Sequence, residues 1–308
     1  MKIIFLGTPE FAVPILSKII ETGHDVVAVV TQPDRINSRG KNIKLSAVKQ
    51  FALSHSIPVY QFERISRDGY ALLSSLDASI MVTAAFGQIL SKEVLNICPF
   101  GVINVHASIL PKYRGASPVQ HAILNGDVLL GVTIMQTALS VDSGDIILIK
   151  TLELYGHETS GEVLKRLACL GAEAVIDALS LINSGKAVFT PQNASEATYC
   201  KTIKKEDAHI NFDAPARTVI NFIRAMNPTP IAYTITQYGR LKILEALIDD
   251  NDYSNSPGAI VRVDKEKISI MCGDRAIVPL VVQGENGRVM SANEFFRGHR
   301  IELNSLFS

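Results

Sequence analysis

Short apolar runs rich in β-branched residues alternate with segments of helical period along the first half of the chain, and this alternation constrains the fold more than any other feature. The strand-like runs are Ile3–Leu6, Val26–Thr31, Ser79–Thr83 and Val102–Val105, and the helical segments between them include Phe11–Ile20 and Ala47–Ser54. Such alternation is typical of βαβ units, which build a mostly parallel sheet with helices on both faces. The sequence therefore predicts a Rossmann-like α/β fold.

Two further apolar runs and a long helix extend this pattern. Gly131–Gln136 and Asp145–Leu152 predict two more strands. Thr159 and Glu162 have the spacing of a capping box, which predicts the start of a long helix. The α/β domain is therefore expected to span residues 1–186.

The pattern changes after this point, and a second, smaller domain is expected. Residues 187–206 are polar and rich in turn formers, which predicts a linker. A helix is expected from about Pro215 to Met226, and five short strand-like runs follow it at Ile231–Thr236, Leu241–Ala246, Ala259–Val263, Ile268–Met271 and Ala276–Gln283. Five short strands with glycine-containing turns predict a β-barrel of the oligonucleotide/oligosaccharide-binding (OB) type over residues 207–308.

Composition excludes several classes of protein. Hydrophobic residues make up 47% of the 308 residues, so the chain can bury a core and is not a disordered tail. Basic and acidic residues balance at 30 each, so any nucleic-acid contact must come from local patches. The sequence has neither a membrane-length apolar run nor a recognisable leader, and its four cysteines lack the spacing of a zinc site or a disulfide framework. We therefore expect a cytoplasmic protein without membrane contact.

The turn after the first strand argues against a nicotinamide cofactor. A dinucleotide-binding turn needs the glycines of GxGxxG so that the backbone can approach a pyrophosphate. Here the turn is Gly7-Thr-Pro-Glu-Phe11. Glu10 opposes the positive end of the following helix and would repel a phosphate. This turn therefore predicts a structural connection.

The stretch GVINVHASILPKYRG, residues 101–115, is the most informative part of the chain. Asn104 and His106 lie two residues apart on the expected strand, so their side chains point to the same side near its carboxyl end, where open α/β sheets bind ligands. Ser108–Pro111 is too short and too interrupted by proline to form a helix at once, so we expect a loop over a ligand. Taken singly, Asn104 or His106 is better explained as a structural polar residue.

A second polar turn changes that interpretation. Asp142 lies near the tip of the sequence SVDSGD, which links two expected strands, and Gly144 is available for a positive φ. If Asp142 returns to the sheet edge of Asn104 and His106, an amide, an imidazole and a carboxylate share one site. This set suits acyl transfer to an amine: Asn104 and His106 stabilise an oxyanion, and Asp142 orients the histidine and accepts a proton through water. No GxSxG-type nucleophile is present, so we expect direct transfer.

At these residues the sequence resembles the methionyl-tRNA formyltransferases, and the resemblance covers essentially the whole chain. It rests on NVHASILPKYRG and VDSGD, and also on FLGTPEFAVP, TQPDR, RGK, TAAFGQIL, GVTIMQ and RAMNPTP. The resemblance implies an enzyme that transfers the formyl group of 10-formyltetrahydrofolate to the α-amino group of methionyl initiator tRNA in translation initiation. It gives residues 1–186 the catalytic role and residues 207–308 the role of contacting tRNA.

The same resemblance implies roles for individual residues. Asn104, His106 and Asp142 fall on the catalytic positions. The folate-binding positions are matched by Ser108, Ile109, Leu110 and Pro111 and by Phe86, Gly87, Gln88 and Ile89. The loop that reads the acceptor end of the tRNA is matched by residues 35–44, with Arg35, Arg39, Lys41 and Lys44 as the tRNA-binding side chains. No metal is implied, and we expect a monomer.

Local charge supports the tRNA assignment but leaves alternatives open. Residues 34–49 carry five basic side chains against Asp34 alone, and they follow directly from the second expected strand. Phosphate contacts by such a loop would provide salt-dependent affinity. The alternatives are a formyltransferase that acts on an amino sugar nucleotide, a non-catalytic RNA-binding protein built on the barrel, and hydrolysis of formylated folate without an acceptor.

Overall fold

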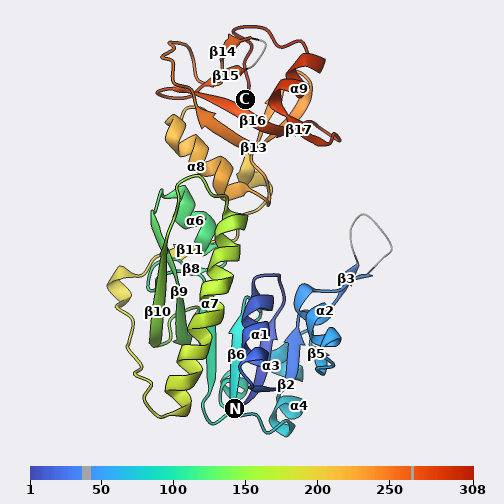
Figure 1. Cartoon of the computed structure of the whole chain (residues 1–308), viewed down its shortest axis with the longest axis vertical. Helices are drawn as coiled ribbons and strands as arrows, with labels where there is room; N and C mark the ends of the chain where they lie inside the picture. Colours follow the sequence, from blue (N-terminus) through green and yellow to red (C-terminus); the bar gives the residue numbers. More distant parts are fainter. Residues whose placement is uncertain (37–42, 265–266) are drawn as a thin grey trace. The chain divides into compact units, whose positions relative to one another are not determined.

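The computed structural model describes residues 1–36, 43–264 and 267–308 (Figure 1). These residues form two compact units. The first unit comprises Met1–Pro118, Leu129–Glu153 and Leu164–Cys200, and the second comprises Val119–Val128, Leu154–Val163 and Lys201–Ser308. Two internal segments that precede Lys201 in the sequence therefore belong to the second unit.

A seven-stranded sheet forms the centre of the first unit, with the strand order β10-β9-β7-β6-β1-β2-β5. The strands are β1 (Lys2–Gly7), β2 (Asp25–Thr31), β5 (Val59–Gln61), β6 (Ile80–Ala84), β7 (Val102–His106), β9 (Leu129–Gln136) and β10 (Ile146–Glu153). The pairings from β5 to β7 are parallel, whereas β9 pairs antiparallel with both β7 and β10. The predicted mostly parallel sheet is confirmed.

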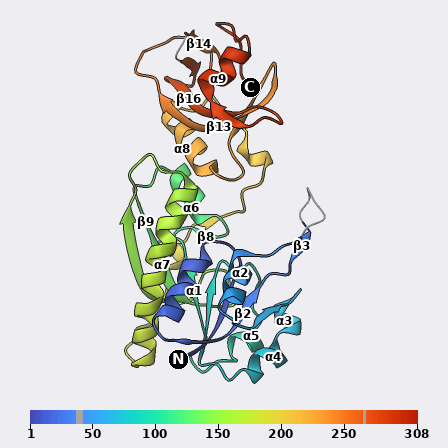
Figure 2. The same cartoon turned by 45° about the vertical axis from the view of Figure 1, so that its right-hand side comes forward.

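Helices cover both faces of this sheet (Figure 2). The helices are α1 (Ala12–Glu21), α2 (Ala47–Ser54), α3 (Ile65–Asp68), α4 (Tyr70–Ser75), α5 (Lys92–Leu95) and α7 (Ser160–Asn183). Ile4 of β1 packs in one cluster with Ile65, Leu73 and Val94 of α3, α4 and α5. Successive residues of a strand point to opposite faces, so the buried Ile3 points to the other side. There α7 approaches α1 and β7 closely, since a Cβ at Gly171 would lie 3.0 Å from Val105 Cγ1 and 3.5 Å from Ile15 Cδ1.

An antiparallel sheet forms the second unit, with the order β12-β13-β16-β15-β14 and with β17 paired to β16. The strands are β12 (Tyr233–Thr236), β13 (Gly239–Ile248), β14 (Ile260–Val263), β15 (Ile268–Met271), β16 (Ala276–Gln283) and β17 (Val289–Ser291), and the helices are α6 (Pro118–Leu124), α8 (Ala216–Met226) and α9 (Ala292–Gly298). Val219 and Ile223 of α8 share one core with Leu241 and Ile277 of the sheet. The predicted OB-like unit is confirmed.

Residues 190–200, which the sequence assigns to a linker, are attached to the first unit. Thr190 exchanges two backbone hydrogen bonds with Ile146, of 2.8 and 2.9 Å. Strand β11 (Tyr199–Cys200) pairs in parallel with β8 (Arg114–Gly115). Two short 3-10 helices, η1 (Ala194–Glu196) and η2 (Glu206–Ala208), complete the connection. The chain thus returns to the residues after β7 before it enters the second unit.

Two strands of two residues each, β3 (Arg35–Ile36) and β4 (Ile43–Lys44), pair antiparallel at the base of the predicted tRNA loop. In the ranges that the structure describes, we find no helix whose length and apolar character would let it cross a membrane.

Candidate active site

Three polar side chains, two from a strand of the large sheet and one from a connection between two other strands, meet at one place. Asn104 and His106 lie on β7, and Asp142 lies in the connection between β9 and β10. Asn104 Nδ2 is 3.5 Å from Asp142 Oδ1, and His106 Nδ1 is 3.6 Å from Asp142 Oδ2. The structure therefore brings together the amide, the imidazole and the carboxylate that the sequence predicts to share a site.

One ring nitrogen of His106 is hydrogen-bonded to the backbone, and the other faces the Asp142 carboxylate. Its Nε2 lies 3.0 Å from the Tyr113 carbonyl oxygen, which can only accept a hydrogen bond, so Nε2 carries the hydrogen. Nδ1 at 3.6 Å from Asp142 Oδ2 is too distant for a good hydrogen bond but close enough for an ion pair when the ring is charged. With the residue only 6% exposed, this orientation is held by the protein. Nδ1 is consequently the nitrogen that can take up or release a proton.

Asp142 adopts a left-handed backbone conformation, with φ of +48°. Its Oδ2 accepts a hydrogen bond of 2.8 Å from the backbone N–H of Gly115. The sequence prediction placed the positive φ at Gly144, and this is wrong. Gly144 is required for a different reason, because a Cβ there would lie 1.8 Å from the Gln136 carbonyl oxygen. Aspartate tolerates the left-handed region better than most residues, so the turn can present its carboxylate from that conformation.

Thr83 orients the amide of Asn104. These two residues are register partners in the pairing of β6 with β7. Thr83 Oγ1 donates a hydrogen bond of 2.8 Å to Asn104 Oδ1, so the amide turns its Nδ2 toward Asp142. Sequence reasoning missed Thr83, although its place at the end of the strand expected at Ser79–Thr83 and at the start of TAAFGQIL was a usable signal.

Two further polar residues, both missed by sequence reasoning, hold the turn that contains Asp142. Gln192 Nε2 donates hydrogen bonds to the carbonyl oxygens of Asp142 and Gly144, at 3.0 and 2.7 Å. Gln192 Oε1 in turn accepts hydrogen bonds from Arg114 Nε and Nη2, at 3.0 and 2.7 Å. Gln192 lies in the expected linker, and nothing in the sequence connects it with Asp142.

The predicted folate loop after β7 is folded against β9. Thr133 Oγ1 donates to the Ser108 carbonyl oxygen at 2.7 Å and accepts from the backbone N–H of Leu110 at 3.1 Å. The Leu110–Pro111 peptide bond is cis. Ser108 and Leu110 are buried, whereas Ile109 and Pro111 are partly exposed. A ligand can therefore reach the side chains of Ile109 and Pro111.

In the second predicted folate segment, two side chains serve the fold and two positions are accessible. Gln88 Nε2 donates to the Phe62 carbonyl oxygen at 2.9 Å, and its Oε1 accepts from the backbone N–H of Ile65 at 2.9 Å. Phe86 is buried in the core, whereas Gly87 has φ of +81° and Ile89 is 73% exposed. Gly87 and Ile89 are thus the positions of this segment that a planar ligand can approach.

Of the predicted tRNA-binding residues, Arg35 and Lys44 face each other across the β3–β4 pairing and are exposed. Arg39 and Lys41 lie outside the described residues. Lys49, another basic residue of this region, forms a short ion pair with Asp34 and donates a hydrogen bond of 2.8 Å to Gln61 Oε1. The hydrogen bond from Lys49 holds the pKa of the Asp34 carboxyl below its ordinary value. Lys49 therefore anchors the base of the loop.

Comparison with known proteins identifies the family. The family model described as formyl transferase matches residues 1–179, and the formyl transferase C-terminal domain model matches residues 202–300. The methionyl-tRNA formyltransferase of Agathobacter rectalis is 40% identical over 309 residues, which cover 100% of both chains. The chain belongs to the methionyl-tRNA formyltransferase family. This formyltransferase is accordingly an enzyme, and the predicted resemblance is confirmed.

Solved structures with low sequence identity share the fold of this formyltransferase. The N-formyltransferase of Helicobacter canadensis, in complex with folinic acid and dTDP-3-aminofucose, superposes with a TM-score of 0.69 at 21% identity and covers 91% of this chain and 98% of its own. HypX of Aquifex aeolicus, in complex with tetrahydrofolic acid, gives a TM-score of 0.66 at 15% identity over 96% of this chain. This chain corresponds to 47% of HypX. At these identities the comparison shows a common architecture.

Metal-ligating side chains do not gather in the described parts of this formyltransferase, where no group of three or more His, Cys, Asp or Glu residues could hold an ion. All four cysteines are free thiols. Burial raises the pKa of Cys98 to about 11, so this thiol stays protonated at neutral pH.

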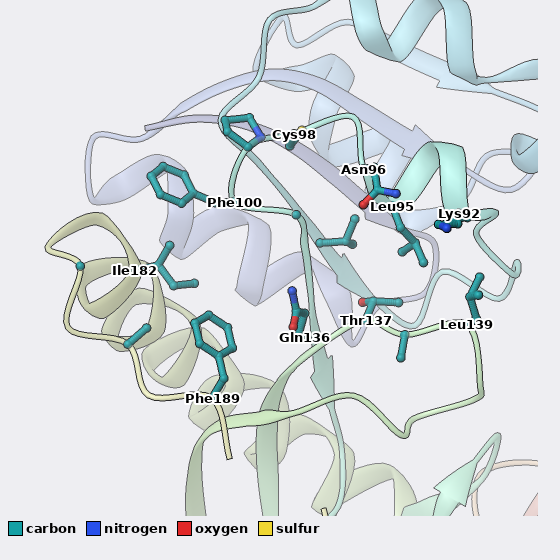
Figure 3. A pocket seen from close by; sticks show the side chains of 16 residues that line it. Lys92, Leu95, Asn96, Cys98, Phe100, Gln136, Thr137, Leu139, Ile182 and Phe189 are labelled. Carbon is teal, nitrogen blue, oxygen red and sulfur yellow. The ribbon is translucent and has the colours of Figure 1, made fainter. Parts of the chain in front are cut away.

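A pocket of about 910 Å³ lies at the end of the sheet where β7 begins and β9 ends (Figure 3). Gly101, Gln136, Thr137 and Ile182 are among the residues that line it, whereas Asn104, His106 and Asp142 are not. Thr137 Oγ1 is buried without a hydrogen-bond partner. No side chain of the trio lines this pocket. We therefore define the candidate active site by Asn104, His106 and Asp142 and not by the pocket.

Proposed function

We propose that this enzyme transfers the formyl group of 10-formyltetrahydrofolate to the α-amino group of methionyl initiator tRNA, in the cytoplasm, and so supports translation initiation. One observation carries the proposal: an amide, an imidazole and a carboxylate converge on one sheet edge in a chain that matches methionyl-tRNA formyltransferases over its full length. The donor provides an electrophilic formyl carbon and a nitrogen leaving group. The protein has to stabilise the oxyanion and move one proton.

Asn104 and His106 are the groups suited to stabilise the oxyanion. The hydrogen bond from Thr83 leaves the amide N–H groups of Asn104 as donors, and the bond to the Tyr113 carbonyl leaves His106 Nδ1 as the variable proton site. Preorganised donors of this kind lower the barrier because their alignment costs nothing during the reaction. The amine nitrogen then adds directly to the formyl carbon, the new C–N bond forms, and the bond to the donor nitrogen breaks.

Asp142 supports both donors and assists proton transfer. Its Oδ1 faces Asn104, and its Oδ2 faces His106 while accepting the Gly115 N–H. A carboxylate in this position stabilises a protonated imidazole and orients it. The amine loses one proton on forming the amide, and the Asp142 carboxylate accepts it through water, while the protonated imidazole gives its proton to the departing nitrogen. Asp142 then passes its proton to His106 Nδ1, which restores both groups. Protons therefore balance over one turnover.

Accessible parts of the other predicted segments support the substrate assignments. Ile109, Pro111, Gly87 and Ile89 offer partly exposed apolar or backbone surface for a pterin ring. Arg35 and Lys44 place two exposed positive charges at the base of the loop that we assign to the acceptor end of the tRNA. Arg39 and Lys41 extend the same basic segment of the sequence. We propose a monomer as the active form.

Incubation of the purified protein with methionyl initiator tRNA and 10-formyltetrahydrofolate tests the proposal. We expect N-formylmethionyl-tRNA, detected after mild hydrolysis, and its loss with His106→Ala. Parallel reactions contain a dTDP-amino sugar in place of the tRNA, or no acceptor. Preferential formylation of the sugar, or release of formate without an acceptor at the same rate, would overturn the assignment.

A further inference from the structure

The turn that contains Asp142 needs external support. Asp142 has a positive φ, and the turn closes with a hydrogen bond of 2.8 Å from the Gln136 N–H to the Asp145 carbonyl oxygen. The nearby Leu139 and Val141 are exposed hydrophobic residues, 61% and 55% accessible, so their side chains do not anchor the turn in the core. A non-glycine residue in the left-handed region persists only where its surroundings impose it.

Gln192 provides such support through a single amide group. Its Nε2 has two hydrogens, and it donates to the carbonyl oxygens of Asp142 and Gly144, the residues on either side of Ser143. The Asp142 carbonyl belongs to the residue whose carboxylate faces Asn104 and His106. The Gln192 side chain therefore fixes the backbone segment that orients the Asp142 carboxylate.

Arg114 determines which way this amide points. Its Nε and Nη2 both donate to Gln192 Oε1, and Arg114 is only 5% exposed. A flipped amide would place its NH2 group against the guanidinium and its oxygen against two carbonyl oxygens, so only one orientation satisfies the network. Arg114 Nη1 also donates to the Tyr199 hydroxyl at 3.3 Å.

The same short strand supports the carboxylate itself. Gly115, the neighbour of Arg114 on β8, donates its N–H to Asp142 Oδ2, and β8 is paired with β11. A Cβ at Gly115 would lie 2.2 Å from the Cys200 carbonyl oxygen, so this close pairing needs glycine. Asp142 is thus held twice from one strand, at its side chain by Gly115 and at its backbone through Arg114 and Gln192.

We infer that Gln192, oriented by Arg114, is a positioning residue for formyl transfer: it holds the turn of Asp142 so that the carboxylate faces Asn104 and His106. The inference rests on the proposed function of Asp142. Because Gln192 acts on the Asp142 backbone, its loss should reduce turnover much more than substrate binding, since displacing a reacting group by about 1 Å can cost up to about a hundredfold in rate.

Gln192→Glu separates positioning from simple structural support. Glutamate keeps an oxygen for Arg114, now with an opposite charge, but it loses both donors and turns an oxygen toward the Asp142 and Gly144 carbonyls. If Gln192 serves only to anchor Arg114, this variant should retain its activity. If it positions Asp142, kcat should fall by about tenfold to a hundredfold while KM for either substrate changes by less than about twofold.

Gln283 offers a matched control in the second unit. Its Oε1 accepts a hydrogen bond from Lys242 Nζ at 3.3 Å, and its Nε2 donates to the Gly287 carbonyl oxygen at 2.9 Å. Gln283→Glu therefore makes the same chemical change, beside a cation and a backbone carbonyl, far from Asp142 in the sequence. We expect this variant to keep the kcat of the original protein.

Hydrogen exchange gives a second readout that does not depend on activity. The amides of residues 137–145 should exchange faster in Gln192→Glu than in the original protein and in Gln283→Glu, while the thermal unfolding midpoint stays close to the original. Unchanged exchange in this segment, or an unchanged kcat in Gln192→Glu, would overturn the inference. If the original protein forms no formylmethionyl-tRNA, the proposed function fails, and the exchange experiment still decides whether Gln192 holds the turn.

Discussion

Two carboxylates with low exposure, one in each unit, have very different surroundings. Asp249 in the second unit accepts hydrogen bonds from the backbone N–H and Nδ2 of Asn251, at 3.0 and 2.9 Å, and a short one from Ser269 Oγ. Asp142 in the first unit accepts one strong bond, from Gly115, and lies 3.5 and 3.6 Å from Asn104 and His106. The Asp249 network is closed, whereas the Asp142 network keeps capacity for another partner.

This difference separates a polar network that stabilises the fold from one that can do chemistry. Burial alone would raise the pKa of Asp249, but hydrogen bonds from Ser269 and Asn251 outweigh it and leave that pKa below its ordinary value. A fully satisfied carboxylate rigidifies its surroundings and has nothing left to offer a substrate. Asp142 instead faces Asn104 and His106, two groups that can donate hydrogen bonds to an oxyanion.

The largest expected effect is a loss of turnover when a residue of the Asp142 network, which we call the open network, is replaced. His106→Ala and Asp142→Ala should each lower kcat by at least about a hundredfold, the usual scale for a positioned acid, base or oxyanion donor. Steady-state kinetics with methionyl initiator tRNA measures this effect. Near-normal kcat in either variant would remove that residue from the mechanism and would make the open network as purely structural as that of Asp249.

A smaller effect is expected from the residue that orients the amide. Thr83→Val removes the hydrogen bond to Asn104 at nearly constant volume, and we expect kcat to fall by about fivefold to tenfold, the equivalent of one net hydrogen bond. Thr234, whose Oγ1 donates to the Ser308 carbonyl oxygen at 3.0 Å, provides the matched control. Thr234→Val should lower stability but leave kcat alone. Equal kinetic effects in the two variants would contradict the assignment.

Basic side chains near the predicted tRNA loop allow a third test, because some are paired with a carboxylate and others are exposed to a ligand. Lys49 is paired with Asp34, whereas Arg35 and Lys44 are exposed on β3 and β4. The double variant Arg35→Ala, Lys44→Ala should lower kcat/KM for tRNA by about threefold to tenfold and flatten its dependence on salt, because phosphate contacts release counterions. KM for the folate should not change. A change in the folate KM would assign this loop to the donor site.

The closed network should affect stability and leave turnover unchanged. Asp249→Asn should lower the free energy of unfolding by about 1–3 kcal/mol at pH 7, because buried donors lose a charged acceptor. The pKa of Asp249 is lowered by folding, so its contribution is complete above the ordinary aspartate pKa of about 4 and is lost as pH falls through the folded value. The difference in melting temperature between variant and original should therefore shrink toward pH 3. A constant difference would contradict this account.

Much of the fold could be predicted because its signals are local. The strands expected at Val102–Val105 and Ile268–Met271 correspond to β7 (Val102–His106) and β15 (Ile268–Met271), since runs of β-branched residues bounded by turn formers have few alternatives. The meeting of Asn104 with His106 follows from the period of a strand. Strand β17 and helix α9 were not predicted, because both are short and depend on packing against β16 and its neighbours.

The chemical character of the site could be inferred from residue types, but the residues that hold the site in place could not. Thr83 is 21 residues from Asn104, and Gln192 is 50 residues from Asp142, so no local pattern links them. The positive φ was assigned to Gly144 on conformational preference, whereas the close approach of the Gln136 carbonyl needs glycine there and leaves the left-handed conformation to Asp142.

The sequence by itself determined the class of fold, the strand that carries Asn104 and His106, and the set of functional groups, because periodicity, turn chemistry and family motifs are written in neighbouring residues. Only the tertiary structure decided that Asp142 reaches those groups and that Thr83, Arg114 and Gln192 hold them in place. Hydrogen bonds between distant segments depend on how β6, β7, β8 and the chain after α7 come together in the first unit, and that arrangement has no local signature in the sequence.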